Sequence, residues 1–182
     1  NMIYFGTGKD FEFSDKSSTS LQTFYGIVDE GAEIGLGRDA LQEQTIYAQG
    51  FYSFGDESRE LRLTSDNSLG DNDKGWYIDL ETPHSSGVAD QLGERVLNTP
   101  VLRGARVIFS TLTYTNDPCE AGGYGWEMEL NRYTGGRLSY VSVDYNGDGV
   151  FDENDKVTDA DGNMADVVVD LAKTHIVSKL DR

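Results

Sequence analysis

Residues 144–155, with the sequence DYNGDGVFDEND, place short oxygen-bearing side chains at a spacing that suits a calcium ion. Asp144, Asn146 and Asp148 stand on alternate residues, and Gly149 follows where a calcium loop must turn sharply. Ca²⁺ takes about six to eight oxygen ligands at about 2.3–2.6 Å, whereas an ordinary acidic turn needs no such register. The pattern predicts a Ca²⁺ site with ligands drawn from Asp144, Asn146, Asp148, Val150, Asp152 and Asp155.

Two ligand sets fit this loop. In a twelve-residue loop, Asp155 closes the site and Asp152 binds the ion directly or through water. In a nine-residue loop of the form D-x-N-x-D-x-x-x-D, Asp152 closes the site and Asp155 lies outside the ligand ring. Val150 offers its carbonyl in both. Position 12 is Asp rather than the Glu of an EF-hand, and the preceding SYVSV is strand-like rather than helical.

Other polar clusters are interpreted as turns. Residues 159–163 repeat the acidic alternation, but their glycine comes too early and a hydrophobic run follows, so a hairpin turn is favoured over a second metal site. Residues 71–73 precede Gly75 and are expected to form a turn. Residues 6–9 lack the upstream glycine and the following Ser or Thr of a phosphate-binding loop.

The sequence contains no recognisable catalytic arrangement. His84 and His175 are the only histidines, and neither has a meaningful spacing to Cys119 or to a serine motif. Acid pairs are abundant in so acidic a chain, so they do not by themselves indicate glycoside hydrolysis. We therefore expect a binding protein rather than an enzyme.

The composition narrows the class of protein and of partner. The chain has 182 residues and a formal net charge of −17, which disfavours nucleic acids and anionic lipid as partners. No window approaches the roughly 18 apolar residues of a membrane helix. Eight Phe, ten Tyr and two Trp are enough for a packed core, so one domain over residues 1–182 is predicted. Cys119 cannot form an internal disulfide, since it is the only cysteine.

Short strand-like runs separated by Gly-, Asn- and Asp-rich turns predict an all-β fold of mainly antiparallel sheets. The clearest alternation lies at 60–64 and 126–130, where one face is expected to be apolar and the other wet. RLSYVSVD at 137–144 is also predicted to be a strand. Helical turns are expected only within 37–44 and after residue 152. The abrupt strand-like start is what we expect of a piece cut from a longer protein.

Several stretches together carry a family resemblance. They are IYFGTGKDFEFSD (3–15), QTFYGIVDE (22–30), GWYIDL (75–80), GERVLNTPVLRGARVIFST (93–111) and NDPCEAGGYGWEMELNRYTGG (116–136), followed by the acidic loop. In order and spacing they resemble the calcium-binding β-propeller domain of the PilY/PilC proteins, which are associated with the tip of type IV pili. The resemblance extends from the first residues to about residue 155.

The resemblance implies the later portion of an irregular β-propeller with few short helices, whose calcium loop is tied to pilus extension, retraction and surface adhesion. The family's ligand pattern maps onto Asp144, Asn146, Asp148 and Asp152, which favours the nine-residue set. It implies pilus subunits (minor pilins) or cell-surface components as partners. The implied location is the bacterial surface, at the pilus tip or in the outer membrane or periplasm. The Arg-Gly-Asp adhesion motif of some members is missing, because Ala105 follows Gly104. The alternative is an extracellular module that binds a glycan or a partner and holds a purely structural calcium.

Overall fold

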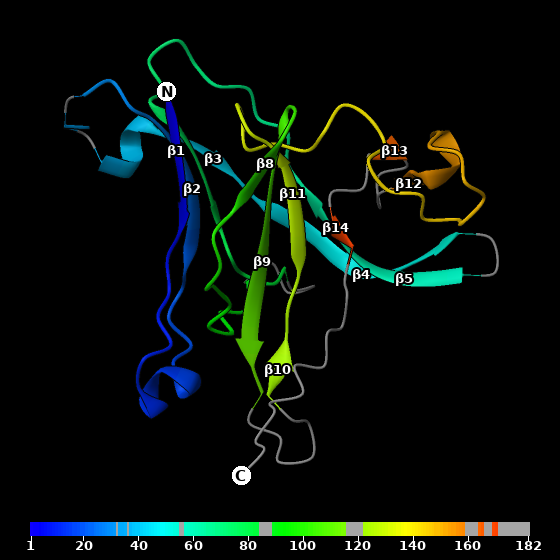
Figure 1. The fold of residues 1–182 in the computed structure, drawn as a ribbon, viewed down its shortest axis with the longest axis horizontal. Coiled ribbons are helices and arrows are strands. Elements are labelled where there is room, and N and C mark those ends of the chain that lie inside the picture. The colour runs from blue at the N-terminus through cyan, green and yellow to red at the C-terminus, as the bar shows by residue number, and fades with distance from the viewer. Residues whose placement is uncertain are drawn as a thin grey trace.

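The computed structural model describes residues 1–31, 33–35, 37–54, 57–83, 89–115, 122–158, 164–165 and 169–170. Within these residues the regular structure consists of strands and short 3₁₀ turns, arranged in sheets of which none closes on itself (Figure 1). The prediction of an all-β, mainly antiparallel fold is confirmed. The expected propeller arrangement stays a prediction, because the strand pairing does not by itself place these sheets as blades around a common axis.

The first sheet has four strands in the order β1-β2-β6-β3. β1 (Met2–Gly6), β2 (Thr23–Val28) and β6 (Gly75–Asp79) pair antiparallel, whereas β3 (Gln42–Gln44) pairs parallel to β6. The connection between β1 and β2 contains the 3₁₀ turn η1 (Phe13–Ser17). The 3₁₀ turn η2 (Gly37–Ala40) begins the segment 37–44 where a helical turn was expected, and the last three residues of that segment form β3.

The second sheet has the strand order β10-β9-β11-β14-β5-β4, and β7 and β8 also pair with β9. Its strands are β4 (Ile46–Phe54), β5 (Glu57–Thr64), β7 (Arg95–Val96), β8 (Val101–Arg103), β9 (Arg106–Tyr114), β10 (Gly123–Tyr124), β11 (Glu127–Asn131) and β14 (Val169–Asp170). A third, two-stranded sheet of β12 (Val157–Thr158) and β13 (Met164–Ala165) follows the 3₁₀ turn η3 (Glu153–Asp155). The acidic loop thus lies between β11 and this small sheet, beside the β4–β5 hairpin (Figure 1).

The main core lies between the first two sheets. Phe24 of β2 stacks on Phe109 of β9 with ring centroids 3.7 Å apart and an interplanar angle of 4°. Trp76 from β6 and Trp126, which precedes β11, are also buried in this core. Burial of such aromatic side chains is worth about 1.5–3 kcal/mol each, so this contact is a large contribution to holding the sheets together.

Trp76 also fixes the loop that leaves β11 toward the acidic loop. Its Nε1 donates to the carbonyl oxygen of Arg132 at 3.1 Å. Gly135 has a φ of +72°, and a Cβ at this position would overlap the Trp76 indole. Only glycine suits both the left-handed backbone and the close approach, so this turn is packed directly on the core.

The strand predicted at 137–144 is wrong, because the structure has no strand there. Leu138 is buried, and the backbone N–H of Arg137 donates to the carbonyl of Ser65 at 3.1 Å. The alternating side chains were not enough, because a strand also needs a neighbour along its length, and no described strand pairs with this segment. The chain instead crosses irregularly from β11 to the acidic loop.

The expectation of a solvent-exposed polar face at 60–64 is also wrong. Leu61 and Leu63 are buried as predicted, but Arg62 and Thr64 on the opposite face are buried as well, at 0% and 1% exposed. Arg62 lies over the Trp126 ring and forms an ion pair with Glu94. The alternation at 126–130 is confirmed, since Met128 and Leu130 are buried and Glu127 is exposed.

Candidate metal centre

Asp144 closes the tip of the acidic loop. Its Oδ1 accepts a hydrogen bond from the N–H of Gly147 at 2.7 Å, and its Oδ2 accepts one from the N–H of Gly149 at 2.8 Å. Both glycines have positive φ, 75° and 82°, a region that side chains with a Cβ enter only with strain. Gly149 therefore turns the chain where the sequence pattern requires a sharp turn.

The alternate residues of the tip bind backbone amides two positions further on. Asn146 Oδ1 accepts from the N–H of Asp148 at 2.9 Å, and Asp148 Oδ1 accepts from the N–H of Val150 at 2.7 Å. The side-chain amide of Asn146 also donates to Asp148 Oδ2 at 3.1 Å. These successive turns place Asp144, Asn146 and Asp148 within one short tip, in which Asp148 is exposed and the other two are half-buried.

Asp155 lies at the base of the loop and is buried, with 1% of its surface exposed. Its Oδ1 accepts from the N–H groups of Tyr145 and Asn146, at 2.8 and 3.1 Å, and its Oδ2 accepts from the N–H of Asp152 at 3.1 Å. This carboxylate therefore ties the start of the loop to its end. Such a role matches the nine-residue set, in which Asp155 lies outside the ligand ring.

Asp152 precedes the 3₁₀ turn η3 and caps it. Its Oδ1 accepts from the N–H of Asn154 at 2.8 Å, and its Oδ2 accepts from the side-chain amide of the same residue at 3.2 Å. Asp152 is thus directed toward η3 in this structure. Val150, the remaining predicted ligand, is 53% exposed at the tip, next to Phe151 at 60%.

An aromatic contact anchors the loop to the rest of the protein. Tyr145 is 2% exposed and stacks on Phe54 of β4, with ring centroids 5.1 Å apart. It belongs to a second buried cluster with Leu61, Leu63 and Val157. Sequence reasoning missed this anchor, although a large aromatic inside a polar run is a usable signal. The tip is therefore exposed while its base is held against the β4–β5 hairpin.

The residues fit a hard divalent cation in type. All the predicted donors are oxygens, and a carboxylate oxygen that accepts one N–H keeps a second lone pair for a cation. In the part of the chain that the structure describes, however, no three His, Cys, Asp or Glu side chains converge closely enough to hold a metal ion. Asp144, Asn146 and Asp148 share the tip, whereas Asp152 and Asp155 bond within the base. Ca²⁺ binding thus remains a prediction that the donor chemistry supports.

The other clusters considered in the sequence have simpler roles where they are described. Asp73 Oδ2 accepts from the N–H of Gly70 at 2.6 Å, so residues 70–73 form a turn, as expected. Residues 6–9 connect β1 to the segment before η1, and Thr7 pairs with Thr23. The histidines, Cys119 and the turn predicted at 159–163 lie outside the described residues.

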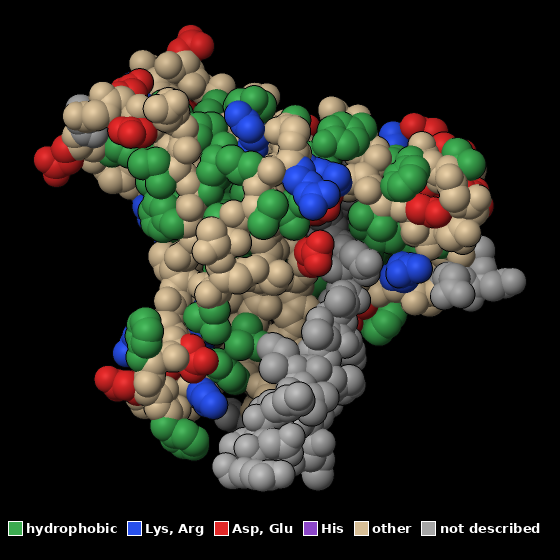
Figure 2. Space-filling model, viewed as in Figure 1, with side chains coloured by type: hydrophobic (Ala, Val, Ile, Leu, Met, Phe, Trp, Pro, Cys, Tyr) green, Lys and Arg blue, Asp and Glu red, His purple; other side chains and the backbone are tan. Residues whose placement is uncertain are grey.

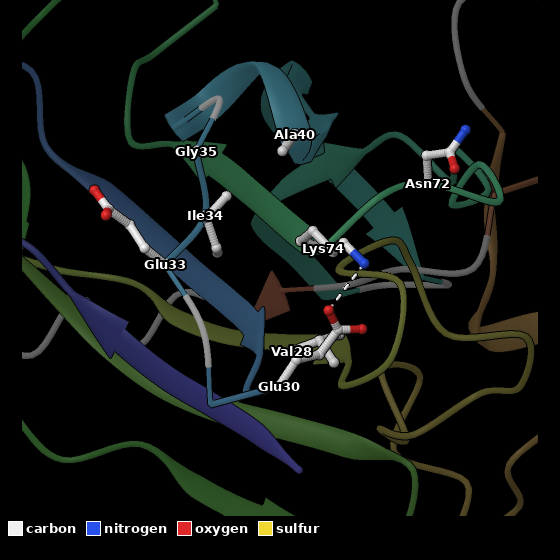
Figure 3. Close-up of a pocket in the computed structure, with 8 residues that line it drawn as sticks. All are labelled: Val28, Glu30, Glu33, Ile34, Gly35, Ala40, Asn72 and Lys74. Atoms are coloured by element: carbon white, nitrogen blue, oxygen red, sulfur yellow. Dashed lines mark hydrogen bonds and ion pairs between the residues drawn. The ribbon is translucent and has the colours of Figure 1, made fainter.

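A pocket of about 170 Å³ lies beside the end of β2 and the segment that leads into η2 (Figure 3). Val28, Ile34 and Ala40 supply apolar lining, and Lys74 Nζ lies 2.9 Å from a carboxylate oxygen of Glu30 across its mouth. Because the cation is already paired and the acids are exposed, this pocket offers no catalytic arrangement.

Comparisons with known proteins agree on one family. PilY1 of Pseudomonas aeruginosa strain PAO1, a type IV pilus biogenesis factor, is 35% identical over 167 residues, which cover 83% of this chain and 14% of the relative. A PilY1 homolog of Xylella fastidiosa is 37% identical over 145 residues, covering 78% of this chain and 9% of the relative. The chain thus spans a small part of the length of these relatives.

The comparison with solved structures gives the same family. The crystal structure of the Pseudomonas aeruginosa PilY1 C-terminal domain matches 94% of this chain and 36% of its own, with a TM-score of 0.79 and 30% identity. No family model matches the sequence. In the described residues no helix is long and apolar enough to cross a membrane. The chain belongs to the PilY1 family of type IV pilus proteins.

Proposed function

We propose that this chain is a calcium-binding part of a type IV pilus biogenesis factor that acts at the cell surface and regulates pilus extension, retraction and adhesion. The relatives named as type IV pilus biogenesis factors support the pilus assignment. The single observation that carries the calcium assignment is the exposed tip, where Asp144, Asn146 and Asp148 present oxygen donors on alternate residues. Pilus subunits or cell-surface components are the proposed partners.

Calcium would act on the tip and on Asp152, and not on the contacts that Asp155 and Tyr145 make at the base of the loop. Asp155 and Tyr145 hold the base through backbone amides and the stack on Phe54, contacts in which no cation takes part. Asp144, Asn146, Asp148 and Asp152, with the Val150 carbonyl, would hold the ion, which neutralises the carboxylates at close range. With calcium bound, the tip would present one ordered surface. Without calcium, the same surface would be more mobile.

The test is a calorimetric titration of Ca²⁺ into chelator-treated protein, beside Asp148→Ala and Asp155→Ala. We expect one site in the wild type, no binding in Asp148→Ala and weaker binding in Asp155→Ala, whose loop base is loosened. Equal loss in both variants would favour the twelve-residue set. A wild type that binds nothing up to millimolar Ca²⁺ would disprove the calcium assignment.

The anchored base also favours a second candidate, a β module that binds a glycan or a partner and in which calcium is purely structural. A loop already fixed by Asp155 and Tyr145 needs the ion only for local stability. Twitching motility of a strain carrying Asp148→Ala separates the two. Lost motility with a folded protein supports regulation, and normal motility with a lowered Tm supports the structural role.

A further inference from the structure

Residues 9–18, here called the phenylalanine loop, carry two side chains that the described structure leaves uncovered. Phe11 is 91% exposed and Phe13 is 90% exposed. The loop forms a lobe at the lower left of the molecule, with hydrophobic side chains at its outer end (Figure 2). A single exposed hydrophobic residue needs no explanation, but two at one projecting tip are typical of an interaction site.

The buried carboxylate of Asp15 holds this tip in one conformation. Its Oδ2 accepts from the N–H groups of Phe11 and Glu12, both at 3.0 Å, and its Oδ1 lies 2.8 Å from Lys9 Nζ. Asp15 itself is 3% exposed, although it belongs to a surface loop. The backbone that carries the two rings is therefore bonded from within the loop.

Arg95 of β7 fastens the loop to the second sheet. Its guanidinium is buried and donates to the carbonyl oxygens of Lys9, Asp15 and Ser18, at 3.0, 2.7 and 2.8 Å. Nearby Gly93 has a φ of +70°, and a Cβ there would clash with the Ser18 carbonyl. A loop built in this way presents its rings in an ordered conformation, which lowers the entropy cost of binding.

The charges around the rings indicate the kind of partner. Both lysines of the loop are occupied: Lys9 pairs with Asp15, and Lys16 lies over the Tyr114 ring, 5.5 Å from its centroid. Glu12, between the two phenylalanines in sequence, is exposed. The whole chain carries −17, which repels nucleic acid, anionic lipid and a second copy alike.

We propose that the phenylalanine loop is a docking element whose two rings insert into an apolar cleft of a partner protein with a basic rim. The rings supply buried apolar area, and exposed Glu12, together with the negative charge of the whole chain, complements the basic rim and sets the orientation. The contact uses neither the acidic loop nor its calcium, so it goes beyond the proposed function. Asp148→Ala leaves this docking unchanged.

The experiment uses the full polypeptide in its native cells, with Phe13 replaced by the photoreactive analogue p-benzoylphenylalanine. Irradiation is expected to give one protein adduct, which is identified by mass spectrometry and then purified for titration. Phe11→Ser with Phe13→Ser is expected to weaken its binding at least tenfold. Glu12→Lys should weaken it severalfold and flatten its salt dependence. The matched control is Phe51→Ser, which removes a ring 73% exposed on β4, and it should change binding less than twofold.

Several outcomes would overturn the proposal. They are an adduct with lipid, with a second copy or with another part of the same polypeptide, the absence of any adduct, or binding that the double serine variant leaves intact. Circular dichroism confirms that each variant folds, which is expected because the replaced side chains are exposed. If Asp148→Ala abolishes calcium binding while docking persists, docking does not depend on calcium. Failure of the calcium hypothesis would then leave the docking hypothesis intact, and the reverse.

Discussion

Asp148 and Asp155 lie seven positions apart in one loop, but their surroundings give them different roles. Asp148 is exposed and bonds to one backbone amide and to the Asn146 side chain, so it stays accessible to a cation. Asp155 is buried and takes three backbone N–H groups. A carboxylate with that many amide donors contributes to folding whether or not an ion is bound.

Replacing Asp155 by Asn tests this difference. The variant keeps the size of the side chain but leaves one amide nitrogen facing backbone donors, so we expect a loss of about 1–3 kcal/mol in the free energy of unfolding. Chemical denaturation in the presence of chelator measures the loss. The matched control Asp148→Asn, on the exposed tip, should change stability by less than about 0.5 kcal/mol. Equal effects of the two variants would contradict the distinction.

Asp15 predicts a specific response to pH. The ion-paired hydrogen bond from Lys9, followed by the backbone N–H of Glu12, lowers its pKa from 3.8 to about 2. Because the folded state favours the carboxylate, its stabilisation is present above about pH 4 and is lost as the pH falls toward 2. NMR titration of the Asp15 carboxyl carbon should give a midpoint near 2, and Asp15→Asn should remove this part of the acid sensitivity. A midpoint near 4 would show that the bonds do not form in solution.

The alternating oxygens of 144–148 and the glycine at 149 were predictable from spacing alone, because both requirements are local. The task of Asp155 was not, since the amides it binds are brought to it by the Tyr145 anchor on β4. A ligand pattern records which donors are present. It does not record which of these side chains bind backbone amides in the folded protein.

At the scale of the elements, the ion pair of Arg62 and Glu94 joins β5 to the segment that leads into β7. Two hydrogen bonds of 2.7 Å connect the guanidinium to the carboxylate, Gln49 Oε1 accepts from Arg62 Nε at 3.0 Å, and both charged residues are buried. The Trp126 ring lies 4.1 Å from the guanidinium carbon. The pair therefore joins β5 to a segment thirty-two positions further along the chain.

Glu94→Gln is expected to lower the free energy of unfolding by about 3–5 kcal/mol, because it leaves the Arg62 cation buried without its counter-charge. Equilibrium denaturation measures this loss. The double variant Glu94→Leu with Arg62→Met removes both charges and should be markedly less destabilised than Glu94→Gln alone. If the double variant is as unstable as the sum of its single changes, the two residues are not coupled.

This pair also explains one limit of reading strands from sequence. The alternation at 60–64 correctly identified a strand and its apolar face. In the sequence, however, the buried arginine on the other face cannot be told from a solvent-exposed polar residue. Its burial depends on Glu94, thirty-two positions away. The segment 137–144 failed for the related reason that a strand depends on its neighbours.

At the scale of the whole molecule, the outer face of the first sheet carries an aromatic row. Phe5 stacks on Tyr25 at 5.1 Å, Tyr25 lies 6.2 Å from Tyr77, and the Arg38 guanidinium lies 3.9 Å from the Tyr77 centroid. Ile3 and Phe5 remain 50% and 40% exposed. A partly apolar face of this kind is typical of a sheet that packs against another.

A salt of calcium can stabilise a chain with a net charge of −17 in two ways, by general screening of charge and by binding to a specific site. Repulsion among surface carboxylates is screened by any salt, since the Debye length falls to about 10 Å at 0.1 M ionic strength. A calcium site adds stability only when its own ion is bound, by about 2.7 kcal/mol at one hundred times the Kd. For a chain of this size that corresponds to a rise in Tm of about 5–10 °C.

Thermal unfolding should therefore be followed in CaCl₂ and in NaCl at equal ionic strength. We expect NaCl to raise the Tm by a small amount in the wild type and in Asp148→Ala alike, because general screening does not depend on the loop. CaCl₂ should give the larger rise in the wild type only. Equal shifts in the two salts would mean that the acidic loop binds no calcium. Any rise in Tm with CaCl₂ would then come from screening of the overall negative charge.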